Sequence, residues 1–175
     1  IKLVKSAKGK VHQGFNEALD FVWKDIWEYI QHERSGRSLW ITGHSLGAAL
    51  ACLTVARLLF VYKEPIDGLY TFGQPRVGNW IFSKNFDKVF EVYTFRYVNN
   101  NDVVVRIQFR SLGYSHIGTF RYFNEEGIER NDIDWWEKVK NAFRGVINDY
   151  LVPGLDSVKD HSIDKYVACL KRTLV

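Results

Sequence analysis

The segment Leu39–Leu50 places the sequence Gly-His-Ser-Leu-Gly between an apolar run and a run of small, helix-forming residues. This G-x-S-x-G pattern is typical of a nucleophile elbow, a sharp turn between a strand and a helix that exposes a serine hydroxyl. The turn forces the serine into an unfavourable backbone conformation, so we expect bulky side chains at Gly43 or Gly47 to collide with the neighbouring strand and helix. Ser45 is therefore the predicted nucleophile.

Strand and helix patterns alternate along the chain around this turn. In the first half we predict a connecting loop or frayed start over 1–11, helices over 16–33, 46–62 and 80–90, and strands over 39–42, 68–73 and 91–98. In the second half we predict strands over 116–124 and 128–131, a helical stripe over 136–150 and a last helix from Ser162. This alternation predicts a single α/β domain, residues 1–175, with a mainly parallel central sheet and helices on both faces.

Composition narrows the classes of function. The 175 residues are 46% hydrophobic and 15% aromatic, which is typical of a globular domain. The net charge of +4 comes from scattered basic residues, so no nucleic-acid partner is predicted. The small excess of basic residues is compatible with an anionic lipid surface and equally with an ordinary solvated surface. The sequence has no run of about 18 apolar residues that would predict a membrane span.

Cys52 and Cys169 are interpreted as apolar core residues, with one disulfide as the alternative.

A serine nucleophile requires a base, and the base requires an orienting acid. Two histidines lie downstream of Ser45. His161 falls in a polar loop just before the last predicted helix, from which its ring can reach the elbow, and it is the predicted base. His116 begins a predicted interior strand, where a hydrogen-bonded core histidine is the better interpretation.

The predicted acid is Asp102. It follows the strand 91–98 at the carboxyl end, where ligands gather in α/β sheets. Other aspartates are weaker candidates because they precede a strand, lie within a helix or begin one as a cap; these are Asp67, Asp87, Asp132 and Asp134.

Acyl transfer also requires backbone donors for the oxyanion. The amide of Leu46, at the amino end of the helix after the elbow, is the predicted first donor. The second donor should follow an earlier strand, and we find no strand with such a loop before the helix predicted at Asn16.

Five motifs, in order, are similar to those of the class 3 lipases, the fungal-lipase-like branch of the α/β-hydrolases. They are Val11-His12-Gln13-Gly14-Phe15, Thr42-Gly43-His44-Ser45-Leu46-Gly47-Ala48-Ala49-Leu50, Phe72-Gly73-Gln74-Pro75-Arg76-Val77-Gly78-Asn79, Val98-Asn99-Asn100-Asn101-Asp102-Val103-Val104 and Asp160-His161-Ser162. In that family the elbow serine, the aspartate of the Asn-rich motif and the histidine of the Asp-His-Ser motif form the triad, which implies Ser45, Asp102 and His161. The amino-acid sequences of the later motifs most resemble those of the plant and cyanobacterial type.

This resemblance implies the α/β-hydrolase fold and a serine carboxylester hydrolase that forms an acyl-enzyme, without cofactor or metal. The implied partner is a lipid ester, at a membrane or lipid-droplet surface. The alternative function is a lipase-like protein that binds lipids or partners with weak or no catalysis. The residues specify no oligomeric state, and they carry no targeting signal, which favours a cytoplasmic location as an expectation.

The chain departs from the family pattern at three places. Ala48 replaces the second glycine of a Gly-Gly pair, and Val105–Gln108 stand where the family has prolines after the aspartate. The family's upstream strands, oxyanion motif and lid helix come before the Val-His-x-Gly-Phe segment, whereas this sequence starts at Ile1 and contains no methionine. We therefore expect the N-terminal part of the family domain to be missing from these residues.

Overall fold

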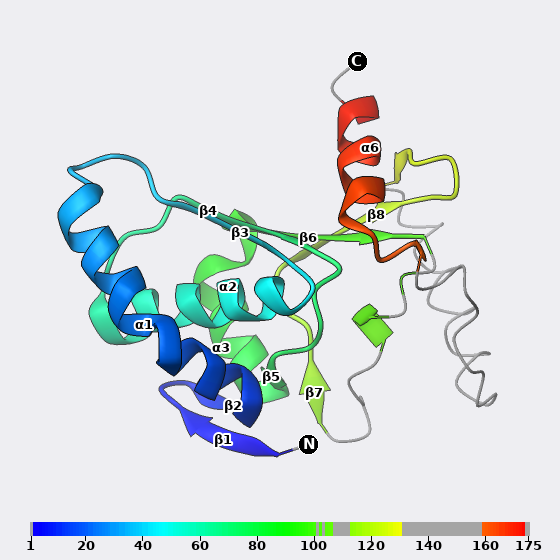
Figure 1. Cartoon of the computed structure of the whole chain (residues 1–175). Helices are drawn as coiled ribbons and strands as arrows, with labels where there is room; N and C mark the ends of the chain where they lie inside the picture. Colours follow the sequence, from blue (N-terminus) through cyan, green and yellow to red (C-terminus); the bar gives the residue numbers. More distant parts are fainter. Residues whose placement is uncertain (1, 101, 103, 107–112, 131–158, 174–175) are drawn as a thin grey trace.

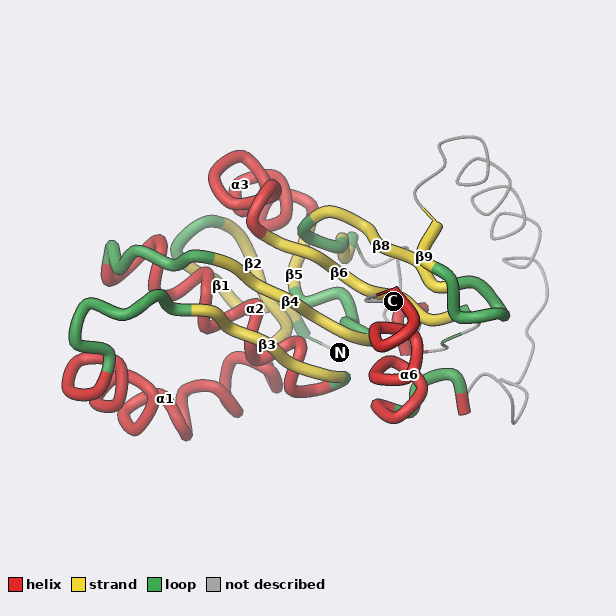
Figure 2. The backbone as a smooth tube through the Cα atoms, turned by 90° about the horizontal axis from the view of Figure 1, so that it is seen from above, coloured by secondary structure: helices red, strands yellow, loops and turns green. Residues whose placement is uncertain are grey.

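A five-stranded sheet forms the centre of the structure, a computed structural model that describes residues 2–100, 102, 104–106, 113–130 and 159–173. Its strands, in spatial order, are β3 (Trp40–His44), β4 (Gly68–Phe72), β6 (Thr94–Asn99), β8 (Thr119–Phe123) and β9 (Glu129–Arg130) (Figure 2). The first four run parallel, and β9 pairs antiparallel with β8. The carboxyl ends of four strands consequently meet at one edge of the sheet, as the sequence predicts.

Helices lie on both faces of this sheet (Figure 1). On one face lie α1 (Gln13–Glu33), α2 (Leu46–Arg57) and α3 (Trp80–Phe90), and on the other lies α6 (Ile163–Thr173) (Figure 1). Parallel strands need such crossovers, and α2 and α3 supply them between β3 and β4 and between β4 and β6. The predicted α/β architecture is confirmed. The stripe predicted over 136–150 lies outside the described residues, and no described helix combines the length and apolar character needed to cross a membrane.

The helix after the elbow is the most buried element. Eight of the twelve residues of α2 are buried, because the helix is apolar almost all round. It continues into a π-helical turn, η1 (Leu58–Tyr62), which ends where Lys63 adopts the left-handed conformation. Cys52 and Cys169 are buried free thiols, which confirms their interpretation as core residues. Burial raises the pKa of the Cys52 thiol.

The loop predicted over 1–11 is wrong. The structure has a hairpin of β1 (Leu3–Ser6) and β2 (Gly9–His12), in which Val4 lies opposite Val11. Val11 is buried in the main core and Val4 packs against that core. The apolar alternation is short and interleaved with lysines, so only packing against the rest of the chain makes the hairpin evident.

Two other strands differ from their predicted ranges. The strand predicted over 91–98 starts at Thr94, because Glu91–Tyr93 forms a 3-10 turn, η2, and Thr94 Oγ1 donates to the Phe90 carbonyl (2.9 Å). The strand predicted over 116–124 is divided at Gly118, whose φ of 78° interrupts extended backbone. Only Thr119–Phe123 of the predicted range forms a strand, β8, and a separate short strand just before the range, β7 (Tyr114–Ser115), pairs with β5 (Gly78–Asn79) in a second sheet of order β1-β2-β5-β7.

His116 is partly buried and its ring is hydrogen-bonded, in agreement with its interpretation as a hydrogen-bonded histidine of the core. Its Nε2 is 3.2 Å from the Val105 carbonyl, to which it donates. Burial, and then the nearby cations of Arg96 and Arg76, lower the pKa of His116 well below its ordinary value of 6.5. Arg96 is itself buried, with its guanidinium 4.8 Å from the centre of the Phe120 ring, and burial lowers the pKa of Arg96 to about 10. Protonation of His116 is therefore unfavourable in the folded protein.

This arrangement predicts a pH-dependent stability. Between the lowered pKa of folded His116 and the ordinary value of 6.5, the unfolded chain binds a proton that the folded chain excludes, so stability is lost as the pH falls below 6.5. His116→Gln keeps an amide donor for the Val105 carbonyl and removes the titration. Between about pH 7.5 and pH 5.5, the wild-type free energy of unfolding should fall by roughly 1 kcal/mol more than that of the variant, measured by chemical denaturation.

The control is His32→Gln, which replaces an exposed histidine near the end of α1. An equal pH dependence in wild type and His116→Gln would contradict the prediction.

Candidate active site

The turn between β3 and α2 holds Ser45 in a strained conformation. Its φ of 56° and ψ of −124° lie outside the regions that non-glycine residues favour, a strain of about 1–3 kcal/mol. The Ser45 N–H donates to the Phe72 carbonyl (3.0 Å) and its own carbonyl accepts from Ala48 N (3.0 Å), so the turn is fastened to β4 and to α2. The Ser45 side chain makes no capping hydrogen bond. These features are those of a nucleophile elbow.

The two elbow glycines differ in their role. A side chain at Gly43 would meet the backbone of the first turn of α2, with a Cβ 2.7 Å from Ala48 N. At Gly47 an added Cβ meets nothing within 4 Å. The predicted collision is therefore confirmed at Gly43, whereas Gly47 has room for a Cβ. The reason is that Gly43 lies in β3 beneath the first turn of the helix, whereas Gly47 is exposed in that turn.

Asp102 and His161 lie together at the carboxyl edge of the sheet. His161 Nδ1 is 3.0 Å from both carboxylate oxygens of Asp102. Asp102 is fully buried, and the His161 side chain is 17% exposed. Because a carboxylate accepts, Nδ1 carries the proton, and Nε2 is left as the basic nitrogen. Nε2 is shielded from water and has no hydrogen-bond partner among the described residues.

The elbow and the His161 loop are joined through His44, the residue before the serine. His44 Nε2 donates to the His161 carbonyl (2.7 Å), and the centres of the two rings are 4.6 Å apart. The structure thereby brings the loop of the predicted base against the elbow of the predicted nucleophile. His44 therefore also holds the loop that precedes α6.

Tyr166 is a site residue that the sequence did not reveal. Its hydroxyl donates to Asp102 Oδ2 (2.5 Å) and accepts from the Asn99 N–H (3.0 Å). Burial, and then the Asp102 carboxylate, raise the pKa of Tyr166 well above its ordinary value, so the hydroxyl stays a donor. With Val104 N bonded to Oδ1 (2.9 Å), Asp102 has three partners among the described residues. A tyrosine on the inward stripe of an amphipathic helix resembles a core residue, so the pattern carried no signal of this contact.

The Asn-rich motif fastens the Asp102 turn to the His161 turn. Asn99, which is buried, donates from its side chain to the Asp160 carbonyl (2.9 Å), and the Asn100 side chain donates to Asp160 Oδ2 (3.2 Å). Asn100 has a φ of 37°, in the left-handed region that asparagine tolerates well. Lys165 donates to the other Asp160 oxygen (2.7 Å). The asparagines therefore hold the two loops that carry the acid and the base.

Gly73 provides the space in which Asp102 and His161 meet. It ends β4 with a φ of 60°, and an added Cβ would lie 2.8 Å from both Asp102 Oδ2 and His161 Nδ1. The weaker alternatives lie elsewhere: the His116 ring is bonded to Val105, and Asp87 accepts from Gly118 N (2.8 Å). Asp67 accepts from Leu39 N at the opposite end of the sheet. Asp132 and Asp134 are outside the described residues.

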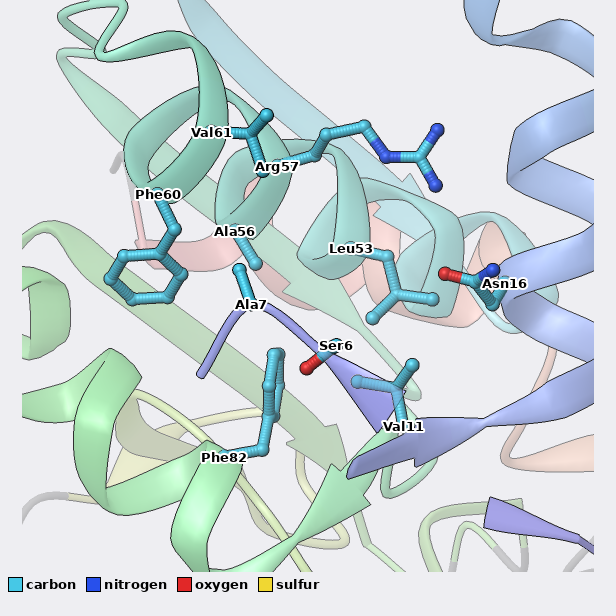
Figure 3. Close-up of a pocket in the computed structure, with 10 residues that line it drawn as sticks. All are labelled: Ser6, Ala7, Val11, Asn16, Leu53, Ala56, Arg57, Phe60, Val61 and Phe82. Carbon is cyan, nitrogen blue, oxygen red and sulfur yellow. The ribbon is translucent and has the colours of Figure 1, made fainter. Parts of the chain in front are cut away.

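Two hollows lie near these elements. A cavity of about 180 Å³ between the hairpin, α2 and α3 is lined mainly by apolar side chains, and its polar lining residues are Ser6, Asn16 and Arg57 (Figure 3). It contains none of the predicted site residues. A mostly apolar groove of about 520 Å³ follows β3 between α1 and α2 and includes Gly47. β3 pairs with β4 only, so its outer edge has no partner strand among the described residues. Among the described residues, no group of three or more His, Cys, Asp or Glu side chains is placed to hold a metal ion.

A parallel sheet, a strained serine elbow and an Asp-His pair at the carboxyl edge define an α/β-hydrolase. The comparisons agree with this class and specify the family. The family model for lipase (class 3) matches residues 1–112. The chain therefore belongs to the class 3 lipase family.

Its relatives include lipases from fungi and plants. The secreted mono- and diacylglycerol lipase LIP4 of Malassezia restricta is 36% identical over 113 residues, which cover 61% of this chain and 37% of that protein. Triacylglycerol lipase OBL1 of Nicotiana tabacum is 39% identical over 102 residues, covering 52% of this chain and 18% of that protein. The chain thus spans less than two fifths of either relative.

Solved structures of lipases share the fold. The lipase from Rhizopus microsporus var. chinensis superposes with a TM-score of 0.66 and 30% identity, over 71% of this chain and 46% of that one. A triacylglycerol lipase whose catalytic centre is a serine protease triad gives a TM-score of 0.60 and 29% identity, over 71% of this chain and 50% of that one. The described chain corresponds to half or less of these structures.

The elbow geometry predicts that alanine substitution has a large effect on stability at Gly43 and a small one at Gly47. Gly43→Ala should lower the free energy of unfolding by about 3 kcal/mol or more, because its Cβ overlaps the backbone of α2. Gly47→Ala should change it by less than about 1 kcal/mol, because the position is open and alanine favours helix. Chemical denaturation of the two variants measures the difference, and similar losses for both would contradict this account.

Tyr166→Phe should lower kcat/KM for an ester by about tenfold, since it removes one hydrogen bond to a buried carboxylate while the ring keeps its packing. The acid limb of the pH profile should move to higher pH, because a carboxylate that has lost a donor attracts the imidazolium proton more strongly.

The matched control is Tyr114→Phe, which removes a buried hydroxyl that has no hydrogen-bond partner among the described residues. Equal activities and superimposable pH profiles for wild type and Tyr166→Phe would show that the hydroxyl does not act through Asp102.

Proposed function

We propose that the protein is a serine carboxylester hydrolase that acts on lipid esters through a Ser45–His161–Asp102 triad. The observation that carries the proposal is the pairing of His161 Nδ1 with the buried Asp102 carboxylate beside the strained Ser45 elbow. The fold and the family add support, since the named relatives are acylglycerol lipases. A lipid ester is the proposed substrate class for that reason.

In the proposed reaction, Ser45 Oγ attacks the ester carbonyl while His161 Nε2 accepts the hydroxyl proton. The carbonyl π electrons move to its oxygen, giving a tetrahedral oxyanion. The alcohol then leaves with the proton that His161 returns, and Ser45 carries the acyl group. Water attacks this acyl-enzyme with His161 again as base, which releases the fatty acid and restores the serine. Asp102 holds the imidazole in the required tautomer throughout.

The first oxyanion donor in this proposal is the Leu46 N–H. The first amides of a helix have no intrahelical partner, so this N–H is free to bind a developing negative charge. The positive end of the α2 macrodipole assists it. The second donor that acyl transfer requires is not found among the described residues.

Ser45→Ala should abolish the hydrolysis of nitrophenyl esters, because it removes the hydroxyl that acts as the nucleophile in this proposal. A series of acyl chain lengths, measured for wild type and Ser45→Ala, gives kcat/KM for each ester. Increasing activity with chain length is expected for a lipid ester substrate. Equal hydrolysis by the two proteins would rule out Ser45 as the nucleophile.

Covalent labelling by a fluorophosphonate separates an active site from a lipase-like binding protein. Labelling of wild type and its loss in Ser45→Ala are expected, since only an activated serine reacts. An intact, folded protein that neither hydrolyses esters nor reacts with the probe would favour the binding function.

A further inference from the structure

The β1–β2 hairpin carries several lysines that do not contribute to the stability of its fold. Residues 1–12 contain four lysines and no acidic residue. In the hairpin register Lys5 lies directly opposite Lys10, on the face away from the buried Val4–Val11 pair, and both lysines are exposed. Like charges in directly opposite positions destabilise an antiparallel pair. The two lysines therefore act against the stability of the hairpin that carries them.

The hairpin lies against the first turns of α3. An added Cβ at Gly9 would be 2.6 Å from Phe82 N, so the turn of the hairpin rests on the helix backbone. Lys10 N donates to Asn79 Oδ1 (3.0 Å), and the Asn85 side chain donates to the Lys8 carbonyl (2.9 Å). The hairpin and α3 consequently form one continuous surface beside the N-terminus of the chain (Figure 1).

The outward side of α3 adds lysines and large apolar residues to this surface. The buried residues of the helix point inward, and the exposed ones include Trp80, Ile81, Lys84 and Lys88. Trp80 is 59% exposed and Ile81 is 44% exposed. The carboxylate of α3, Asp87, is half-buried and accepts from Gly118 N. Glu91, just beyond the far end of the helix, is the nearest exposed acid in sequence.

We call this surface the basic face; it consists of Lys5, Lys8, Lys10, Trp80, Ile81, Lys84 and Lys88. Within the described part of the chain, none of its five lysines forms an ion pair with a carboxylate. The amino end of α3 adds the positive end of a helix dipole. The basic face thus combines uncompensated cations with an exposed tryptophan and isoleucine.

We propose that the basic face docks on an anionic phospholipid bilayer. The lysine ammonium groups bind headgroup phosphates and carboxylates, while Trp80 and Ile81 enter the region between headgroups and acyl chains. A polyanion such as RNA would satisfy the lysines but would leave Ile81 without an apolar partner, so a bilayer fits the surface better. This inference goes beyond the proposed hydrolysis, because it names the surface that brings the enzyme to lipid.

Sedimentation with vesicles tests the docking, using the Ser45→Ala protein so that hydrolysis cannot alter the membrane. Binding should be strong to vesicles containing phosphatidylserine, weak to phosphatidylcholine alone, and reduced by salt. Lys5→Gln/Lys10→Gln/Lys84→Gln should weaken binding about 100-fold, at roughly fivefold for each lysine. Trp80→Ser should remove most of the binding that persists at high salt.

The matched control, Lys24→Gln/Lys63→Gln/Lys171→Gln, removes the same charge from exposed positions outside the basic face. Equal binding by the two triple variants, or equal binding to both kinds of vesicle, would overturn the proposal. RNA binding as tight as vesicle binding and unaffected by Trp80→Ser would also overturn it, in favour of a general polyanion surface. Hydrolysis of a soluble short-chain ester should persist in the lysine variants, so failure of docking and failure of the catalytic proposal give different results.

Discussion

A buried carboxylate governs the arrangement of the carboxyl edge of the sheet. Asp102 has no exposure to solvent, and a charge in that position is stable only when hydrogen-bond donors surround it. The three donors come from separate segments: His161 from the loop before α6, Tyr166 from α6 itself and Val104 from the turn after β6. Satisfying this one group therefore requires α6 to dock against the end of β6.

The serine elbow depends on the same edge from the opposite side. Ser45 N bonds to the end of β4, Gly73 N bonds to the Tyr97 carbonyl of β6, and Asn100 N bonds to the Phe123 carbonyl of β8. These contacts extend the sheet by one residue beyond each strand and bring its catalytic candidates into line. The strain at Ser45 persists because the turn is held by β4 and α2 together.

The spacing of apolar residues was sufficient to predict the long helices and strands. It was insufficient where contacts between residues distant in sequence determine the structure. The limits of α3 are as predicted, because Phe82, Phe86 and Phe90 form a clear inward stripe. The hairpin over 3–12 was missed, because four-residue strands rich in lysine have no periodic signal of their own. The break at Gly118 was also missed. A Cβ there would meet the Thr94 side chain, a contact between residues 24 positions apart that no local pattern contains.

The sequence by itself determined the class of the fold and the candidates for nucleophile, acid and base, because strand–helix alternation and the order of the motifs are local properties of the chain. Only the tertiary structure decided which groups touch. It placed His44 on the His161 loop, Tyr166 on Asp102 and the asparagines on Asp160, and it showed that Gly73, more than Gly47, needs to lack a side chain. The physical reason is that these contacts join residues about 30 to 120 positions apart, whose hydrogen bonds exist only after the sheet and α6 have packed.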